Sequence, residues 1–152
     1  MGDEIGVKLT IISDSMTASE IDEYIGIKCN DSQERGLLNR LGTKRYEHHV
    51  WFLKTRYNVS PDEYVGDKID PQIEQLLSTV RAAAEKIRDL SRNNSVIFGL
   101  YFYAQNIPPL HLSMEQIEAV AALGAQLDID VILSGNPDMN NEEGKEHITR
   151  TD

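Results

Sequence analysis

Residues 95–133 constrain the fold more than any other part of the chain. They begin with Val-Ile-Phe-Gly-Leu-Tyr-Phe-Tyr-Ala at 96–104, an apolar run that predicts a strand buried on both faces. After a Pro-Pro loop, Ser113 and Gln116 have the spacing of a capping box and predict the start of a helix. Residues 129–133 predict a second strand, so the unit is strand–helix–strand with parallel strands. The predicted apolar face of the helix comprises Ile117, Val120, Ala121, Gly124 and Leu127.

Two more strands and a short helix are predicted upstream. Residues 7–12 and 46–55 are rich in β-branched and aromatic side chains, which favours strands. Between them, Thr17 and Glu20 form a second capping box, and Gly26 has the position of a C-terminal cap. This pattern predicts a helix of about two turns.

The longest predicted helix covers residues 70–92. Asp70 is expected to cap it and Pro71 to take its first position, where a missing amide costs nothing. Residues 28–45 and 56–69 contain several Gly, Asn and Pro residues and are predicted to be loops, the first with one helical turn at 35–41.

These elements favour an α+β fold. The order of strands and helices suggests a ferredoxin-like two-layer sandwich of about four strands with an added long helix; the alternative is a small three-layer α/β fold. Residues 1–134 are expected to form one domain, and the polar residues 135–152 a mobile C-terminal tail.

Charge and cysteine content limit the classes of function. The net charge of −10 argues against nucleic acid as a partner, and the longest apolar run is too short to span a membrane. A single cysteine, Cys29, excludes an intrachain disulfide and favours a cytoplasmic location. Residues 28–56 carry seven basic and three acidic groups, so this acidic chain contains one basic segment.

Three short stretches resemble a known family. Residues 21–27 have the pattern Ile-x-x-Tyr-Ile-Gly-Ile, Trp51 lies in a predicted strand, and residues 123–130 have the pattern Leu-Gly-Ala-x-Leu-Asp-Ile-Asp. Together they resemble the bacterial family known as domain of unknown function 4279, over residues 7 to about 133. The resemblance implies a small bacterial, cytosolic protein and brings no established activity or catalytic residue.

No residue pattern predicts catalysis, a metal site or a cofactor. His48 and His49 are adjacent in a strand and so point to opposite faces, which prevents both from binding one ion. Cys29 lacks the features that lower a thiol pKa and is expected to be structural. Asp128 and Asp130 share one side of a strand start and could serve acid–base chemistry or bind a divalent cation, but a role in the helix-to-strand turn is favoured.

Aromatic residues give the most specific candidate site. Tyr101 and Tyr103 share a strand face, and a polar loop follows them. A rigid amphipathic patch of this kind can anchor a protein or a small ligand, although these aromatic residues could instead belong to the core. The candidate binding residues are Trp51, Tyr101, Tyr103, Asn106, His111 and Arg45.

Three functions are compatible with this sequence. The preferred hypothesis is a non-enzymatic protein-binding module, in its sharpest version an immunity-type inhibitor whose acidic surface captures a basic target. The alternatives are a small-ligand sensor and, third, an enzyme. The sequence leaves the oligomeric state and the identity of any partner open.

Overall fold

The computed structural model describes residues 3–133, which contain one six-stranded sheet. The spatial order is β2-β3-β1-β5-β6, and β4 pairs with the beginning of β1. Neighbouring strands are antiparallel except β5 and β6, which are parallel. The strands are β1 (Asp3–Ser13), β2 (Asp31–Gln33), β3 (His49–Lys54), β4 (Tyr57–Val59), β5 (Ser95–Ala104) and β6 (Gln126–Leu133).

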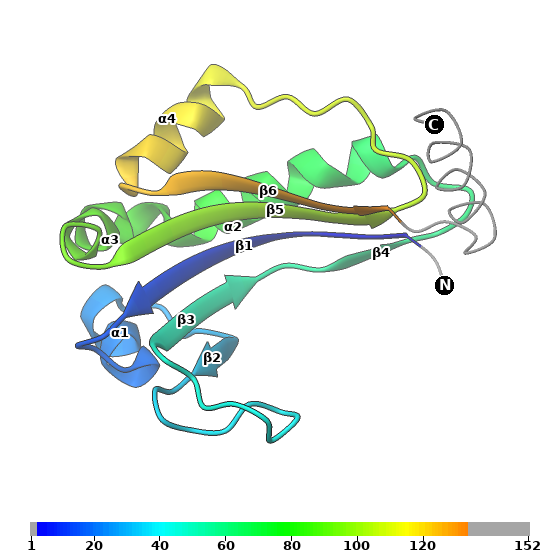
Figure 1. Cartoon of the computed structure of the whole chain (residues 1–152). Helices are drawn as coiled ribbons and strands as arrows, with labels where there is room; N and C mark the ends of the chain where they lie inside the picture. Colours follow the sequence, from blue (N-terminus) through cyan, green and yellow to red (C-terminus); the bar gives the residue numbers. More distant parts are fainter. Residues whose placement is uncertain (1–2, 134–152) are drawn as a thin grey trace, which may run out of the picture.

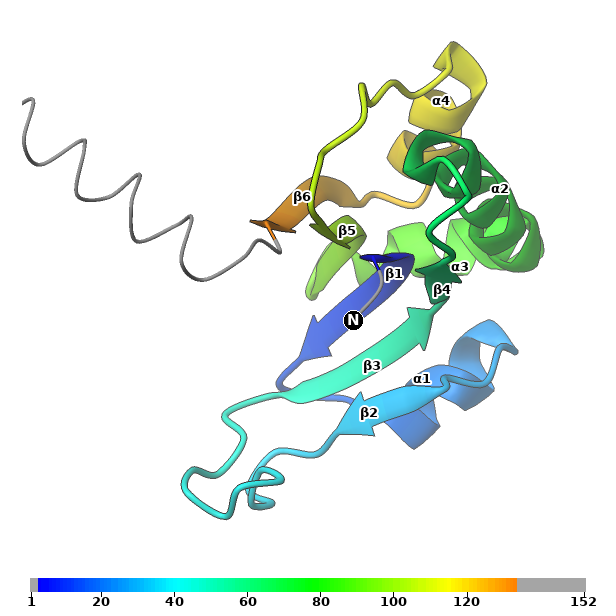
Figure 2. The ribbon, with the colours of Figure 1, turned by 90° about the vertical axis from the view of Figure 1, so that its right-hand side faces the viewer.

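The helices all cover the same face of the sheet and leave the other face open (Figures 1 and 2). The architecture is therefore α+β with two layers, and the three-layer alternative is wrong. The helical elements are α1 (Ala18–Ile25), η1 (Val65–Lys68), α2 (Ile69–Val80), η2 (Arg81–Ala83), α3 (Ala84–Leu90) and α4 (Met114–Ala122).

The core lies between the sheet and the helix layer. Alternate residues of β1, from Ile5 to Ile11, point toward the helices and are buried, as are alternate residues of β5 from Val96 to Phe102. Trp51 of β3 is fully buried among them. Apolar residues of α2 and α3 close this layer, so the hydrophobic effect holds the helices to one face.

Both predicted capping boxes are confirmed. The Thr17 hydroxyl accepts from the Glu20 amide at 3.2 Å, and the Glu20 carboxylate accepts from the Thr17 amide at 3.1 Å. Gly26 ends α1 with a φ of 77°, a conformation that glycine adopts without strain. Ser113 begins α4 by the same reciprocal arrangement with Gln116.

The predicted helix 70–92 begins earlier and is interrupted. A 3₁₀ turn, η1, leads directly into α2, so the N-cap position falls on Lys68 and not on Asp70. The Asp70 carboxylate instead accepts from the Gln116 side chain of α4 at 2.7 Å. A second 3₁₀ turn, η2, separates α2 from α3, and no side-chain hydrogen bond caps it.

Two short strands were not predicted. Strands β2 and β4 lie in segments expected to be loops, and each has only three residues, too few for a periodic signal. The predicted helical turn at 35–41 is absent; an antiparallel bridge joins Leu38 to Arg45 inside a hairpin loop.

The unit at 95–133 has the predicted parallel pairing but different burial. Strand β5 is buried on its helix face only, since Ile97, Tyr101 and Tyr103 lie on the open face and are half-buried. In α4 the predicted apolar face is wrong at Ile117 and Ala121, which are exposed, while Gly124 lies beyond the helix and Leu127 belongs to β6. The predicted tail 135–152 lies outside the described residues, and the single-domain assignment stays a prediction.

One carboxylate joins α1 to β3. Asp22 Oδ1 accepts from the indole Nε1 of Trp51 at 2.7 Å and from the Cys29 amide at 2.9 Å. The indole N–H would otherwise be buried without a partner, which is costly. Asp22 therefore fixes the first helix against the sheet.

Replacing Asp22 tests this connection. Asp22→Ala should lower the free energy of unfolding by about 2 kcal/mol, because it leaves the Trp51 N–H unsatisfied. Asp22→Asn keeps an acceptor and should cost less. Urea denaturation measures both, with the exposed neighbour Glu23→Ala as control. A loss for Asp22→Ala no larger than for Glu23→Ala would refute the role of Asp22.

A second carboxylate holds the segment after β4. Glu63 accepts from Tyr57 Oη at 2.7 Å, from Lys68 Nζ at 2.9 Å and from the Ser60 amide at 3.0 Å. These donors, Lys68 first, lower the pKa of Glu63 from 4.5 to about 2. The contacts also fix the position of β4, which directly follows Arg56.

The Glu63 contacts should give the stability a specific pH dependence. Because the folded pKa lies below the unfolded value, the stabilisation is present above about pH 4.5 and is lost as the pH falls toward 2. Wild type should therefore exceed Glu63→Gln in stability at neutral pH, and the difference should shrink between pH 4.5 and 2. Asp62→Asn controls for the loss of one exposed charge. A difference that does not change over this range would contradict the prediction.

Candidate functional site

The open face of the sheet carries side chains of a different kind from the core face. Strand alternation places every second residue of β1 from Glu4 to Ile12 on this face, beside the matching residues of β3 and β5. Asp128 and Asp130 of β6 are in register with Gly99 and Tyr101 of β5 and so lie on the same face. The face therefore carries charged residues and aromatic rings, together with apolar residues such as Ile12, Val50 and Ile97.

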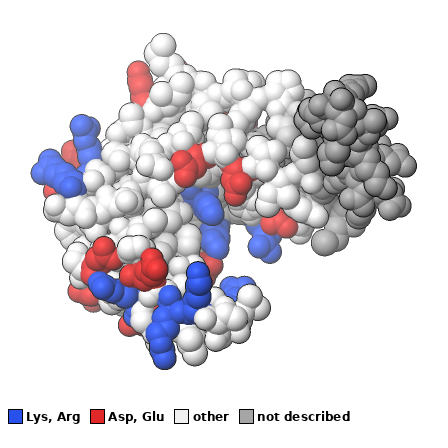
Figure 3. All heavy atoms as spheres, viewed as in Figure 1, with Lys and Arg blue, Asp and Glu red and all other residues white. Residues whose placement is uncertain are grey.

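Two adjoining cavities form a groove along this face. One, of about 230 Å³, lies at the β4 end, and the other, of about 590 Å³, lies toward the opposite end of the strands. Lys8 and Asp130 line both cavities, so we treat them as one site and call it the groove. Figure 3 shows a hollow on this side of the molecule, with basic side chains inside it and acidic side chains along its rim.

Two glycines let side chains lie flat on the floor of the groove. A Cβ at Gly6 would be 2.2 Å from the ring of Tyr101, which therefore lies directly over Gly6. The stem of Lys8 lies over Gly99, with its Cγ 3.5 Å from the place of a Cβ. Both pairs are direct cross-strand neighbours of β1 and β5.

Lys8 and Lys54 are direct cross-strand neighbours on the open face. Two like charges in such positions destabilise a sheet. Lys54 is compensated, because its Nζ lies 2.6 Å from Asp31 Oδ2 and 4.5 Å from the centre of the Phe52 ring. By contrast, none of the ion pairs among residues 3–133 includes Lys8.

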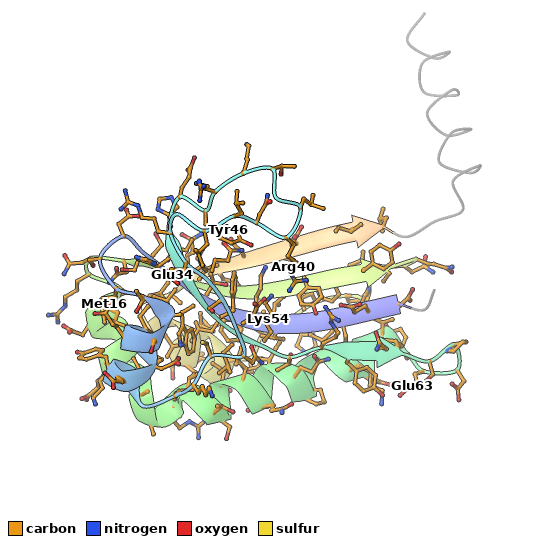
Figure 4. The ribbon with its side chains drawn as sticks, turned by 90° about the horizontal axis from the view of Figure 1, so that it is seen from below. Met16, Glu34, Arg40, Tyr46, Lys54 and Glu63 are labelled. Atoms are coloured by element: carbon orange, nitrogen blue, oxygen red, sulfur yellow. The ribbon has the colours of Figure 1, made fainter. Side chains whose placement is uncertain are left out.

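The hairpin loop between β2 and β3 adds positive charge beside the groove. Figure 4 shows that Arg40 of this loop and Lys54 lie on the side of the sheet opposite the helices. The pKa of Asp31 is lowered, chiefly by its hydrogen bond from Lys54 and to a smaller extent by the positive charge of Arg40. Asp31 thus sits among cations at this side of the groove.

Tyr101 closes the other end of the groove. Its hydroxyl donates to Glu4 Oε1 at 3.3 Å, and Glu4 also pairs with Arg56 Nε at 3.0 Å. Burial raises the pKa of the Tyr101 hydroxyl. Tyr103 lines the same cavity. At this end the charges of Glu4 and Arg56 neutralise each other and the wall is aromatic. Lys8, in contrast, has no ion-pair partner among residues 3–133.

Only two of the six candidate residues chosen from the sequence lie in the groove. Tyr101 and Tyr103 both line the groove. Trp51 does not share their surface, because it points into the core on the opposite face of the sheet. The guanidinium of Arg45 donates to the carbonyl of Gly36 inside the hairpin loop, and Asn106 and His111 are exposed in the segment after β5.

Several groove residues were missed in the sequence. Glu4, Gly6 and Lys8 belong to the first strand, and Lys54 and Arg56 flank the end of β3. The alternation of polar and apolar residues from Glu4 to Ile12 is the signal that could have found the first three. It shows which residues share a face, but not which strands lie beside them.

The histidines and the cysteine have structural contacts. His48 Nδ1 lies 2.5 Å from Asp14 Oδ1 and lowers the pKa of that exposed carboxyl, while His49 Nδ1 accepts from the Arg35 amide at 3.1 Å. Burial, with a hydrogen bond to Asp22, raises the pKa of the Cys29 thiol, which disfavours the nucleophilic thiolate. Within residues 3–133, no group of three or more His, Cys, Asp or Glu side chains is placed to hold a metal ion.

The fold and the groove define a two-layer α+β protein with one open sheet face. The chain belongs to the family described as domain of unknown function (DUF4279), whose model matches residues 3–134. No curated protein and no solved structure is significantly similar to it. In the part of the chain that the structure describes, no helix is both long enough and apolar enough to cross a membrane.

A pair of glycine substitutions tests the floor of the groove. Gly6→Ala should displace the Tyr101 ring and lower the free energy of unfolding by about 1–3 kcal/mol, because the added methyl overlaps the ring. Gly99→Ala makes an ordinary contact with Lys8 and should cost less than about 1 kcal/mol. Chemical denaturation of both variants measures the difference. Equal stability would show that Tyr101 does not rest on Gly6.

Proposed function

We propose that this chain is a non-enzymatic binding domain that holds an extended segment of another protein in the groove, with one acidic side chain of that segment opposite Lys8. The observation that carries the proposal is the Lys8–Lys54 pair, in which Lys54 is compensated by Asp31 and Lys8 has no ion-pair partner among the described residues. Native proteins accept such a local cost at functional sites. A carboxylate of a bound segment would compensate Lys8.

The length of the groove favours an extended ligand. Its lining residues on β1 run from Glu4 to Ile12, which corresponds to about 27 Å of strand. A segment of about eight residues in extended conformation spans this distance, whereas a compact metabolite would fill only one of the two cavities. Phe52 and Tyr103 provide apolar and aromatic contacts on either side of Lys8.

The immunity-type version of the hypothesis receives less support. It requires an acidic surface free to meet a basic target, but Glu63 is already paired with Lys68 and bonded to Tyr57. Lys8 in the groove instead favours a partner that brings one carboxylate to it. A small-ligand sensor is the second candidate, because a cavity of about 590 Å³ falls within the size of ordinary ligand pockets, roughly 300–1,000 Å³.

We further infer a ferredoxin-like arrangement for the part of the fold that precedes α4. Its strands have the spatial order β2-β3-β1-β5 with antiparallel neighbours, and helices follow β1 and β4. The α4–β6 unit is then an addition at one edge. A bacterial origin, a cytoplasmic location and a single domain over residues 1–134 remain proposals of the same kind.

A displayed library of random octapeptides tests the proposed ligand class. Selection on the wild-type chain should enrich peptides with an acidic residue at one fixed position, and Lys8→Glu should weaken the binding of the selected peptides at least tenfold, since a charge-assisted contact becomes a repulsion. Lys86→Glu is the matched control, because it makes the same charge change on an exposed helix residue.

Stability gives an independent readout of the same residue. Lys8→Gln should keep or slightly raise the free energy of unfolding, because it removes a like-charge pair. The proposal is wrong if the selected peptides bind Lys8→Glu and Lys86→Glu equally. The small-ligand alternative would be established if the selection yields no peptide and a metabolite raises the melting temperature only when Lys8 is present.

A further inference from the structure

Strand β6 is an edge strand with an unpaired outer side. It pairs with β5 on one side, and no strand of residues 3–133 pairs with its other side. All eight of its residues are exposed. The opposite edge strand, β2, has only three residues. Exposed long edge strands tend to pair with another chain, and proteins usually protect them with lysine, proline or a bulge. Strand β6 contains no lysine and no proline.

The edge is apolar chiefly on the helix face of the sheet. Leu127, Ile129, Val131 and Leu133 lie on the helix face and Ile132 on the open face, each between 42% and 63% exposed. Scattered exposed apolar residues are common, but a continuous row on one edge indicates an interaction surface.

Helix α4 carries two further exposed apolar residues. Its inner side contacts α2, where Gln116 bonds to Asp70 and Glu74. Met114 and Ile117 are one turn apart on a different side of the helix and are exposed. The five apolar residues of β6 expose on the order of 500 Å², somewhat less than the ~800 Å² that each partner contributes to a standard-size interface.

We propose that this edge binds a second copy of the chain, so that two β6 strands pair antiparallel around a two-fold axis. If the two-fold axis is perpendicular to the sheet, the two sheets form one continuous sheet with both helix layers on the same face. The two α4 helices then lie on either side of the β6–β6 pair. The charges on β6 then select the register. An axis beside Asp130 places the two Asp130 carboxylates opposite each other. An axis beside Ile129 places Asp128 opposite Asp130 of the other copy. Both registers are unfavourable, because like charges face each other directly.

An axis beside Val131 avoids these repulsions. Ile129 then faces Leu133 of the other copy, and Asp130 faces Ile132, so no acidic residue of β6 faces another directly. Among the registers that pair at least five residues of β6 around such an axis, only this one leaves no carboxylate opposite another, so the edge is self-complementary in that register, which favours a second copy over an unrelated strand. Asp130 and Ile132 also line the groove, so the second copy would lie along one wall of that site.

Analytical ultracentrifugation of the full chain over roughly 1–200 µM tests the interface. A concentration-dependent dimer is expected, and Val131→Lys should weaken it at least tenfold while leaving the thermal transition in place, because the substituted residue is exposed. Leu41→Lys is the control, since Leu41 is an exposed apolar residue of the hairpin loop. A monomeric wild type, or equal dimerisation of both variants, would overturn the proposal.

Cross-linking tests the register. In a Cys29→Ala background, Val131→Cys should form an intermolecular disulfide on mild oxidation, because the two residues meet at the axis. Ile129→Cys should cross-link much more slowly, since it faces Leu133 of the other copy. Equal cross-linking of both variants, or none for Val131→Cys, would reject this register even if a dimer forms.

Discussion

Strand β1 is hydrogen-bonded on both sides along most of its length, to β3 and β4 on one side and to β5 on the other. Its register therefore determines what both faces of the central sheet present. A shift by one residue would move Ile5, Val7 and Leu9 to the open face and Lys8 into the core, where an unpaired charge is very costly. The hydrophobic requirement of the core thus also fixes the positions of the groove residues.

The groove exists because no second layer of residues 3–133 covers the open face and because the side chains on that face differ greatly in size. Gly6 and Gly99 provide depth beneath Tyr101 and Lys8, while the acidic residues of β6 and the hairpin loop rise on either side. Substituting larger residues at the glycines would fill the floor without disturbing the core. The same sheet thus has one face closed by packing and one face available for binding.

The sequence predicted local structure well and spatial relations poorly. The capping boxes at Thr17 and Ser113 depend on residues three positions apart, so they can be recognised without knowing the fold. Trp51 and Tyr101 could not be assigned to opposite faces from the sequence, because this depends on the registers of β3 and β5 against β1. For the same reason, the opposition of Lys8 and Lys54, separated by more than forty residues, gives no signal in the sequence.

The charges around the groove limit the kind of ligand that it can bind. Among residues 3–133, four of the thirteen lysines and arginines form ion pairs: Lys54, Arg56, Lys68 and Arg92. Lys8 has two carboxylates, Asp128 and Asp130, along the walls of the same cavity, yet its ion-pairing capacity is unused among the described residues. The acidic walls would repel a purely anionic ligand. The groove therefore favours a ligand that carries one acidic group opposite Lys8 and neutral or basic groups beside β6, and an extended polypeptide can satisfy both requirements along its length.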